Sequence, residues 1–195
     1  QHAAKKTNRA PMMTTTHSET VTHKGAGRIP YVSLLLGAAA LMIHALPGAE
    51  KLALKINDPT WFTTLTSHFV HWNDQHLLWS GGAFVTLAAV CELRARINML
   101  FLIATSIACI SIGLLILPGE ITFYGGLSGI DSALFALVVA RLHGDLRNHR
   151  TRLLAYVPGL CALGFAVKLV YEFRTGQAYF AQAGATMSVV PIAHI

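Results

Sequence analysis

Long stretches without charged residues constrain this chain more than any other feature. Of its 195 residues, 53% are hydrophobic and only 12% are charged, whereas a soluble domain has about 25% charged residues. So few charges leave too little polar surface for a water-soluble fold. Because a bilayer core about 30 Å thick needs roughly 20 apolar residues in a helix, the sequence predicts an all-α, polytopic membrane protein. The six expected spans are 29–49, 75–91, 97–119, 121–140, 153–171 and a last one within 175–195.

The remaining segments have a different character. Residues 1–28 are polar and rich in Thr, His, Lys and Arg, which predicts a disordered tail ahead of a membrane domain over 29–195. Residues 50–74 predict a long polar and aromatic connection between the first two spans rather than a tight turn. The sixth span begins near 182–186, and the chain stops inside it. We therefore expect the last helix to be incomplete.

The distribution of basic residues predicts the orientation in the membrane. With the tail inside, most of the 15 lysines and arginines fall on the inner side, which indicates a cytoplasmic N-terminus. The net charge of +6 does not indicate nucleic-acid binding, because the basic residues lie between apolar blocks and form no continuous face. The expected surroundings are therefore a lipid bilayer. The inner set is Lys5, Lys6, Arg9, Lys24, Arg28, Arg94, Arg96, Arg141, Arg147, Arg150 and Arg152.

A serine and a histidine fall at the same predicted depth. Ser128 lies within about two turns of the outer end of the fourth span, and His194 lies two or three turns into the sixth. Both would then lie roughly 10 Å below the outer surface. A histidine beside a serine removes the hydroxyl proton as the oxygen attacks a carbonyl group. Ser128 and His194 are therefore a candidate nucleophile and base, and donors at the start of the second span are placed to stabilise an oxyanion.

The motifs around these residues resemble those of rhomboid intramembrane serine proteases. Gly126-Leu127-Ser128-Gly129 is similar to the Gly-x-Ser-Gly nucleophile motif of that family, and Ala193-His194 is similar to the Ala-His that supplies the base. His71 and His76, five residues apart, resemble the two histidines at the start of the second helix. The resemblance covers roughly residues 30–195.

The resemblance implies a six-helix bundle that cleaves peptide bonds in or near transmembrane or membrane-anchored substrates. It implies a Ser128–His194 dyad that works without a metal or another cofactor. His71 or His76, with His76 preferred, and the backbone amide of Ser128 would line the oxyanion site beside Gly126.

Two positions depart from the family pattern. The family usually has Asn four residues after the second histidine, where this chain has Ser80. A hydroxyl donates one hydrogen bond over a shorter reach, and the loss of one oxyanion donor costs about 10²–10³ in rate, so reduced activity is one expectation. The arginine that often follows the aromatic residue in the first connection is also absent, since Phe62 follows Trp61.

A narrower resemblance is to rhombosortases, a compact bacterial branch of the rhomboid family. It depends on the run from Tyr124 to Gly129, on Lys168-Leu169-Val170-Tyr171-Glu172 at the end of the fifth span, and on the short loops. It implies a bacterial inner-membrane enzyme. Its substrates would carry a C-terminal sorting tail, made of a Gly-rich motif, a transmembrane helix and a basic cluster.

Two alternative functions remain open from the sequence. If Ser80 or the missing end disables catalysis, the chain is a catalytically inactive rhomboid-like protein that binds transmembrane helices. If instead Asp131 and the histidines carry the function, it is a transporter or a cofactor protein. His68, His71 and His76 could bind a metal or haem, but no cysteine or carboxylate set converges with them, so no metal site is predicted. Asp131 itself either orients the site or pairs with a polar neighbour such as Ser132.

Overall fold

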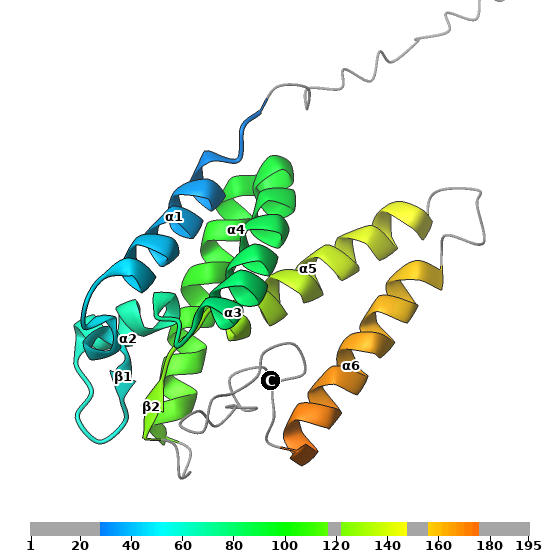
Figure 1. The fold of residues 1–195 in the computed structure, drawn as a ribbon. Coiled ribbons are helices and arrows are strands. Elements are labelled where there is room, and N and C mark those ends of the chain that lie inside the picture. Colours follow the sequence, from blue (N-terminus) through cyan, green and yellow to red (C-terminus); the bar gives the residue numbers. More distant parts are fainter. Residues whose placement is uncertain (1–27, 117–121, 148–155, 176–195) are drawn as a thin grey trace, which may run out of the picture.

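The computed structural model describes residues 28–116, 122–147 and 156–175 (Figure 1). They are mostly helical, which confirms the predicted all-α class. Helices lie over the first five predicted segments, whereas the sixth segment and residues 1–27 of the predicted tail lie outside the described residues. The elements are α1 (Tyr31–Ala45), η1 (Ala49–Leu52), β1 (Leu54–Lys55), α2 (Trp61–Thr66), η2 (Ser67–Phe69), α3 (Asp74–His76), the π-helical η3 (Leu77–Gly81), α4 (Gly82–Ile116), β2 (Phe123–Tyr124), α5 (Ser128–Arg147) and α6 (Val157–Thr175).

Helix α4 is not straight but folds back at Ala95. The backbone of Ala95 is non-helical (φ −157°, ψ 86°), and the arms on either side, 74–94 and 96–116, run side by side in Figure 1. A straight helix over these 43 residues would be about 64 Å long. His68 Nε2, just before the first arm, nevertheless lies 3.3 Å from Ser111 Oγ near the end of the second. The reversal therefore makes a helical hairpin, with arms each about 31 Å long.

The side chain of Glu92, on the first arm, caps the N-terminus of α1. Its Oε1 accepts a hydrogen bond from Val32 N (3.2 Å), and its Oε2 accepts from Ser33 N (2.8 Å) and Ser33 Oγ (2.7 Å). The N-cap residue Pro30 supplies no side-chain bond, so the distant carboxylate satisfies amides that the helix itself leaves without acceptors. Arg96 Nε also donates to Glu92 Oε1 (2.9 Å). The cluster joins α1 to both arms of the hairpin.

The connection between α1 and the hairpin is ordered. Strand β1 pairs with β2 in antiparallel register, with Leu54 opposite Tyr124 and Lys55 opposite Phe123. The short helix α2 begins at a capping box, in which the Thr60 side chain accepts from Thr63 N. The strand pairing ties this connection to the segment that directly precedes α5.

The fourth predicted helix begins later than the sequence suggests. The sequence predicts helix from residue 121, with Ser128 inside it, but residues 122–127 are not helical and α5 begins at Ser128. The predicted start is therefore wrong. Gly126 has a φ of +129°, which a right-handed helix does not allow, and Phe123 and Tyr124 are held in the strand pair.

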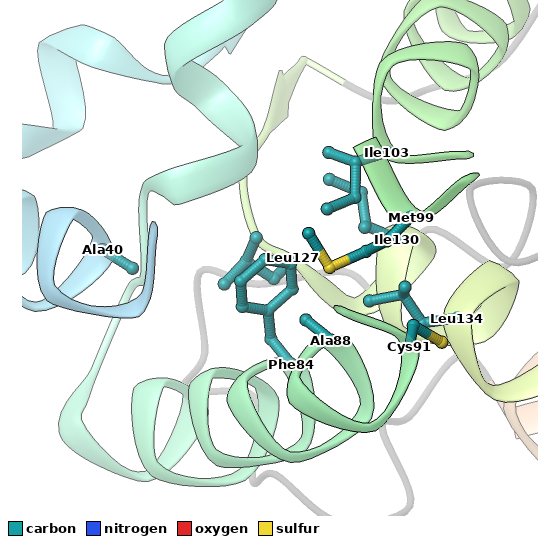
Figure 2. Packing of buried hydrophobic residues seen from close by; sticks show 9 residues of the cluster. All are labelled: Ala40, Phe84, Ala88, Cys91, Met99, Ile103, Leu127, Ile130 and Leu134. Atoms are coloured by element: carbon teal, nitrogen blue, oxygen red, sulfur yellow. The ribbon is translucent and has the colours of Figure 1, made fainter. Parts of the chain in front are cut away.

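The interior is apolar where the helices cross but also holds many polar groups. Figure 2 shows the apolar cluster, in which Phe84 and Ala88 of α4 meet Leu127, Ile130 and Leu134 around the start of α5. The buried polar residues are Ser33, Ser67, His68, His71, Ser80, Glu92, Ser111, Ser132 and Glu172. Large apolar side chains are instead exposed along the outer faces of α1, α4 and α6, among them Leu35, Met42, Ile97, Phe101, Ile116, Leu160 and Leu163. A soluble domain rarely exposes so much contiguous apolar surface.

One helical segment among the described residues, Asp74–Ile116, is long and apolar enough to cross a membrane, and α1 is a shorter apolar helix. That segment is the hairpin itself, and 22% of its apolar stretch is buried. Helix α5 packs mainly against the hairpin, and α6 packs against α5, where the rings of Phe135 and Phe165 lie 5.0 Å apart between centroids.

We predict that Glu92→Ala strongly destabilises the fold. The substitution removes the carboxylate that accepts from two α1 amides, the Ser33 hydroxyl and Arg96 Nε, a loss on the order of 3 kcal/mol. Asp145→Ala is the matched control, because it removes an acid that pairs with Arg94 of the same hairpin while both side chains are about half exposed. Such a surface pair contributes about 0–1 kcal/mol. Thermal unfolding in detergent micelles measures both variants, and equal decreases in Tm would contradict the prediction.

Candidate active site

The predicted nucleophile motif forms a turn that lies directly against the connection and the hairpin. Gly126 N donates to Ser67 O (3.0 Å). A Cβ atom on Gly126 would lie 2.9 Å from His76 Cε1 and 3.0 Å from His76 Nε2, and one on Gly125 would lie 3.3 Å from Val70 O. The distance at Gly126 is too short for a Cβ atom unless the His76 ring moves, the one at Gly125 is tight, and the positive φ of Gly126 also favours glycine. Two adjacent glycines thus allow the backbone to approach His76.

Ser128 follows this turn and is the first residue of α5. Its side chain is half-buried, and its carbonyl oxygen accepts from Ser132 Oγ (3.0 Å). At the N-terminus of a helix the backbone N–H groups point out of the helix end, and the helix dipole favours negative charge there. The position therefore combines a hydroxyl group with an environment that stabilises an anion.

The two predicted histidines form a pair beside the turn. The ring centroids of His71 and His76 lie 5.0 Å apart. His71 Nδ1 is held by Phe69 O (3.0 Å), and Asn73 Oδ1 caps the helix by accepting from His76 N (2.7 Å). His71 Nε2 and His76 Nδ1 are buried with no hydrogen-bond partner among the described residues. Buried polar atoms of this kind normally have a partner, so both nitrogens are available to a bound group.

Ser80 lies one turn after His76 and contacts the start of α5. Its Oγ is hydrogen-bonded to Asp131 Oδ2, with the two oxygens 2.9 Å apart. The turn between them is the π-helical segment η3, and single π-turns in a helix often occur at functional sites. Of the two readings of Asp131, the structure shows pairing with a polar neighbour. That neighbour is Ser80 from the hairpin.

A third buried histidine supports the turn, and sequence reasoning gave it no role in the site. His68 Nε2 lies 3.3 Å from Ser111 Oγ, and its Nδ1 lies 3.5 Å from the hydroxyl of Tyr124. The Tyr124 hydroxyl donates to Gly126 O (3.3 Å). The contact between His68 and Ser111 joins residues 43 positions apart, so no local spacing reveals it. The only sequence signal was His68 itself, a histidine in the segment before the second predicted span.

Burial keeps the histidines of the connection neutral. Burial and, to a lesser extent, the nearby His76 lower the pKa of His71 to about 4. Burial alone lowers the pKa of His68 to about 4. At neutral pH both imidazoles therefore act as hydrogen-bonding groups rather than as charges.

The structure brings most of the predicted site residues together. Gly126 leaves no room for a Cβ atom beside His76, the rings of His76 and His71 meet edge to face, and Ser80 bonds to the first turn of the helix that Ser128 begins. The predicted base, His194, lies outside the described residues. Within the described ranges, no group of three or more His, Cys, Asp and Glu side chains is arranged to hold a metal ion.

Comparisons with protein-family models, with curated proteins and with solved structures gave no match for this chain.

We predict that Gly126→Ala disrupts the site and lowers stability. The added methyl group would clash with the His76 ring, and alanine is strained at a φ of +129°; strain of this kind costs on the order of 1–3 kcal/mol. Gly144→Ala in α5 is the control, because nothing lies within 4 Å of its Cβ position and alanine favours a helix by about 1 kcal/mol over glycine. Thermal unfolding in micelles should show a decrease in Tm for the first variant and none for the second. A decrease confined to Gly144→Ala would refute this account of the turn.

We predict that the fold loses stability as the pH falls from about 6.5 to 4, partly through His68. In the unfolded chain its imidazole has the ordinary pKa of about 6.5, whereas in the fold burial lowers the pKa to about 4. The unfolded state therefore binds more protons in this window, so stability is complete above it and decreases within it. A shift of this size corresponds to on the order of 3 kcal/mol.

The pH dependence of Tm, compared between the wild type and His68→Gln, isolates this contribution. The variant should lose less stability than the wild type between pH 6.5 and 4, although His71 still titrates in it. Parallel curves for the two proteins would show that His68 is not buried in its neutral form.

Proposed function

We propose that this chain is a rhomboid-type intramembrane serine endopeptidase in which Ser128 is the nucleophile and His194 the general base. The observation that carries the proposal is the contact between the glycine turn and the histidine pair. It sets Ser128 at a helix N-terminus, two residues after the backbone that touches His76. A nucleophilic serine needs a nearby site that stabilises the oxyanion, and these residues supply its components.

In the proposed reaction, His194 takes the proton of the Ser128 hydroxyl while the oxygen attacks the carbonyl carbon of the scissile bond. The backbone amide of Ser128 and His76, with His71 beside it, would stabilise the negative oxygen of the tetrahedral intermediate. The intermediate collapses to an acyl-enzyme as the leaving amine takes the proton from His194. A water molecule then attacks the acyl-enzyme by the same steps and releases the acid.

In this proposal the chain is a multi-pass membrane protein, with its N-terminus in the cytoplasm and the active site open to the outer side. The exposed apolar faces of α1, α4 and α6 support it, because lipid is the surrounding that such faces need. The reversal at Ala95 supports two crossings by the hairpin, since each arm matches the thickness of the bilayer core. Arg94 and Arg96 flank the reversal, as the positive-inside rule expects of a cytoplasmic loop.

The proposed substrates are transmembrane or membrane-anchored proteins. The resemblance to rhombosortases narrows them to C-terminal sorting tails at a bacterial inner membrane. The proposed chemistry uses protein groups alone.

A second candidate function is a catalytically inactive rhomboid-like protein that binds transmembrane helices. The observation that favours it is the bond from Ser80 to Asp131. If the only proton of the Ser80 hydroxyl is committed to this carboxylate, Ser80 cannot donate it to an oxyanion, and one donor of the site is lost.

Labelling of the purified full chain with a fluorophosphonate probe separates the two functions. We expect the wild type to be labelled and Ser128→Ala and His194→Ala to lose the label, because the first variant lacks the nucleophile and the second lacks its base. Thr105→Ala is the control: its hydroxyl bonds only to backbone within its own helix, at Phe101 O and Leu102 O, so it should be labelled like the wild type. A folded wild type that takes no label would favour the helix-binding function.

A further inference from the structure

The bond between Ser80 and Asp131 lies beside the proposed nucleophile. Asp131 lies three residues after Ser128, close to the same face of α5, and Ser80 lies four residues after His76 on the hairpin. Gly126 contacts His76 at one end of this interface, and Asp131 bonds to Ser80 at the other. Ser128 is therefore bracketed in sequence by the two contacts, and Ser80 follows His76 by about one helical turn on the hairpin.

The chemical state of the pair determines what Ser80 can do. An ionised carboxylate only accepts hydrogen bonds, so it would take the single proton of the Ser80 hydroxyl. A neutral carboxyl group can instead donate its own proton to Ser80 Oγ. The serine proton is then left to point at another acceptor, and hydrogen bonds in such a chain strengthen one another.

The surroundings of Asp131 favour the neutral form. Its Oδ1 is buried and has no hydrogen-bond partner among the described residues, and a buried carboxylate with one bare oxygen is costly. One ionisable group acts on it electrostatically, Lys168 of α6. The Lys168 ammonium already donates to Glu172 Oε2 (2.7 Å), which offsets its charge.

We propose that Asp131 is a positioning residue that, as a neutral acid, donates to Ser80 Oγ and so directs the Ser80 proton to the oxyanion. This inference rests on the proposed endopeptidase function and adds a second helix to its oxyanion site. Asp131 and Ser80 together supply the hydrogen-bond donor that an asparagine side chain would supply by itself through its amide group. No proton is transferred between Asp131 and Ser80, since the two groups only exchange hydrogen bonds. A carboxylic acid kept neutral by an apolar site is a known type of donor.

The test measures the rate of fluorophosphonate labelling in four variants of the full chain, because the phosphoryl oxygen of the probe takes the oxyanion position. Ser80→Ala should slow labelling about 100-fold, the low end for loss of one oxyanion donor. Asp131→Ala should slow it by a similar factor. The double variant should be no slower than either, because the two residues act as one unit. Asp131→Asn should label close to the wild-type rate, since its amide donates to Ser80 Oγ as the neutral acid does.

The rescue by Asp131→Asn separates a positioning role from a purely structural one. Tm measurements in micelles show which variants are folded, and Ser80→Ala with Asp131→Asn suffices if Asp131→Ala does not fold. The inference is overturned if Ser80→Ala labels like the wild type, if Asp131→Asn is as slow as Ser80→Ala, or if Asp131→Ala labels faster than the wild type. In each case the endopeptidase function stands. A folded wild type that takes no label overturns both.

Discussion

The close approach of the Gly126 backbone to His76 is the contact on which the rest of the site depends. Without side chains at positions 125 and 126, the chain before α5 can lie against the connection, and Gly126 N reaches Ser67 O. That contact fixes where α5 begins. It also sets the register of the first helical turn, so that Asp131 meets Ser80 on the hairpin. One steric requirement at a glycine therefore positions a helix terminus, a histidine and a carboxyl group together.

The placement of polar side chains between the helices, and of apolar ones on the outer faces, explains how such contacts can stabilise the fold. In the proposed lipid surroundings the apolar faces gain little from burial against one another, so hydrogen bonds and close packing must join the helices. Glu92 joins α1 to the hairpin at one end, and the contacts of His68 with Ser111 and Tyr124 join the connection, the second arm and β2 at the other. Several buried polar groups are thus matched to a group on another element. This makes the interior specific even though the outer faces are uniformly apolar.

The helices were largely predictable from the sequence, whereas the contacts between them were not. The long stretches without charged residues revealed the first five helical segments, because about 20 consecutive apolar residues are typical of a helix that spans a bilayer. The start of α5 was misplaced, since apolarity does not distinguish a helix from the extended segment before Ser128. The motif spacing predicted which histidines and glycines gather near Ser128. The bond between Ser80 and Asp131 joins residues 51 positions apart, and the sequence holds no period or motif that links them.

The presence of Ser80 where rhomboid proteases usually have an asparagine has a different meaning once Asp131 is considered with it. A serine alone has a short reach and a single proton, which any ionised neighbour would take. Beside a neutral acid, the same hydroxyl accepts from Asp131 and keeps its proton for another group. The two positions are coupled physically, so neither can be interpreted alone. A serine at position 80 thus weakens the case for an active site only if Asp131 is charged, and the bare buried oxygen of Asp131 argues against that charge.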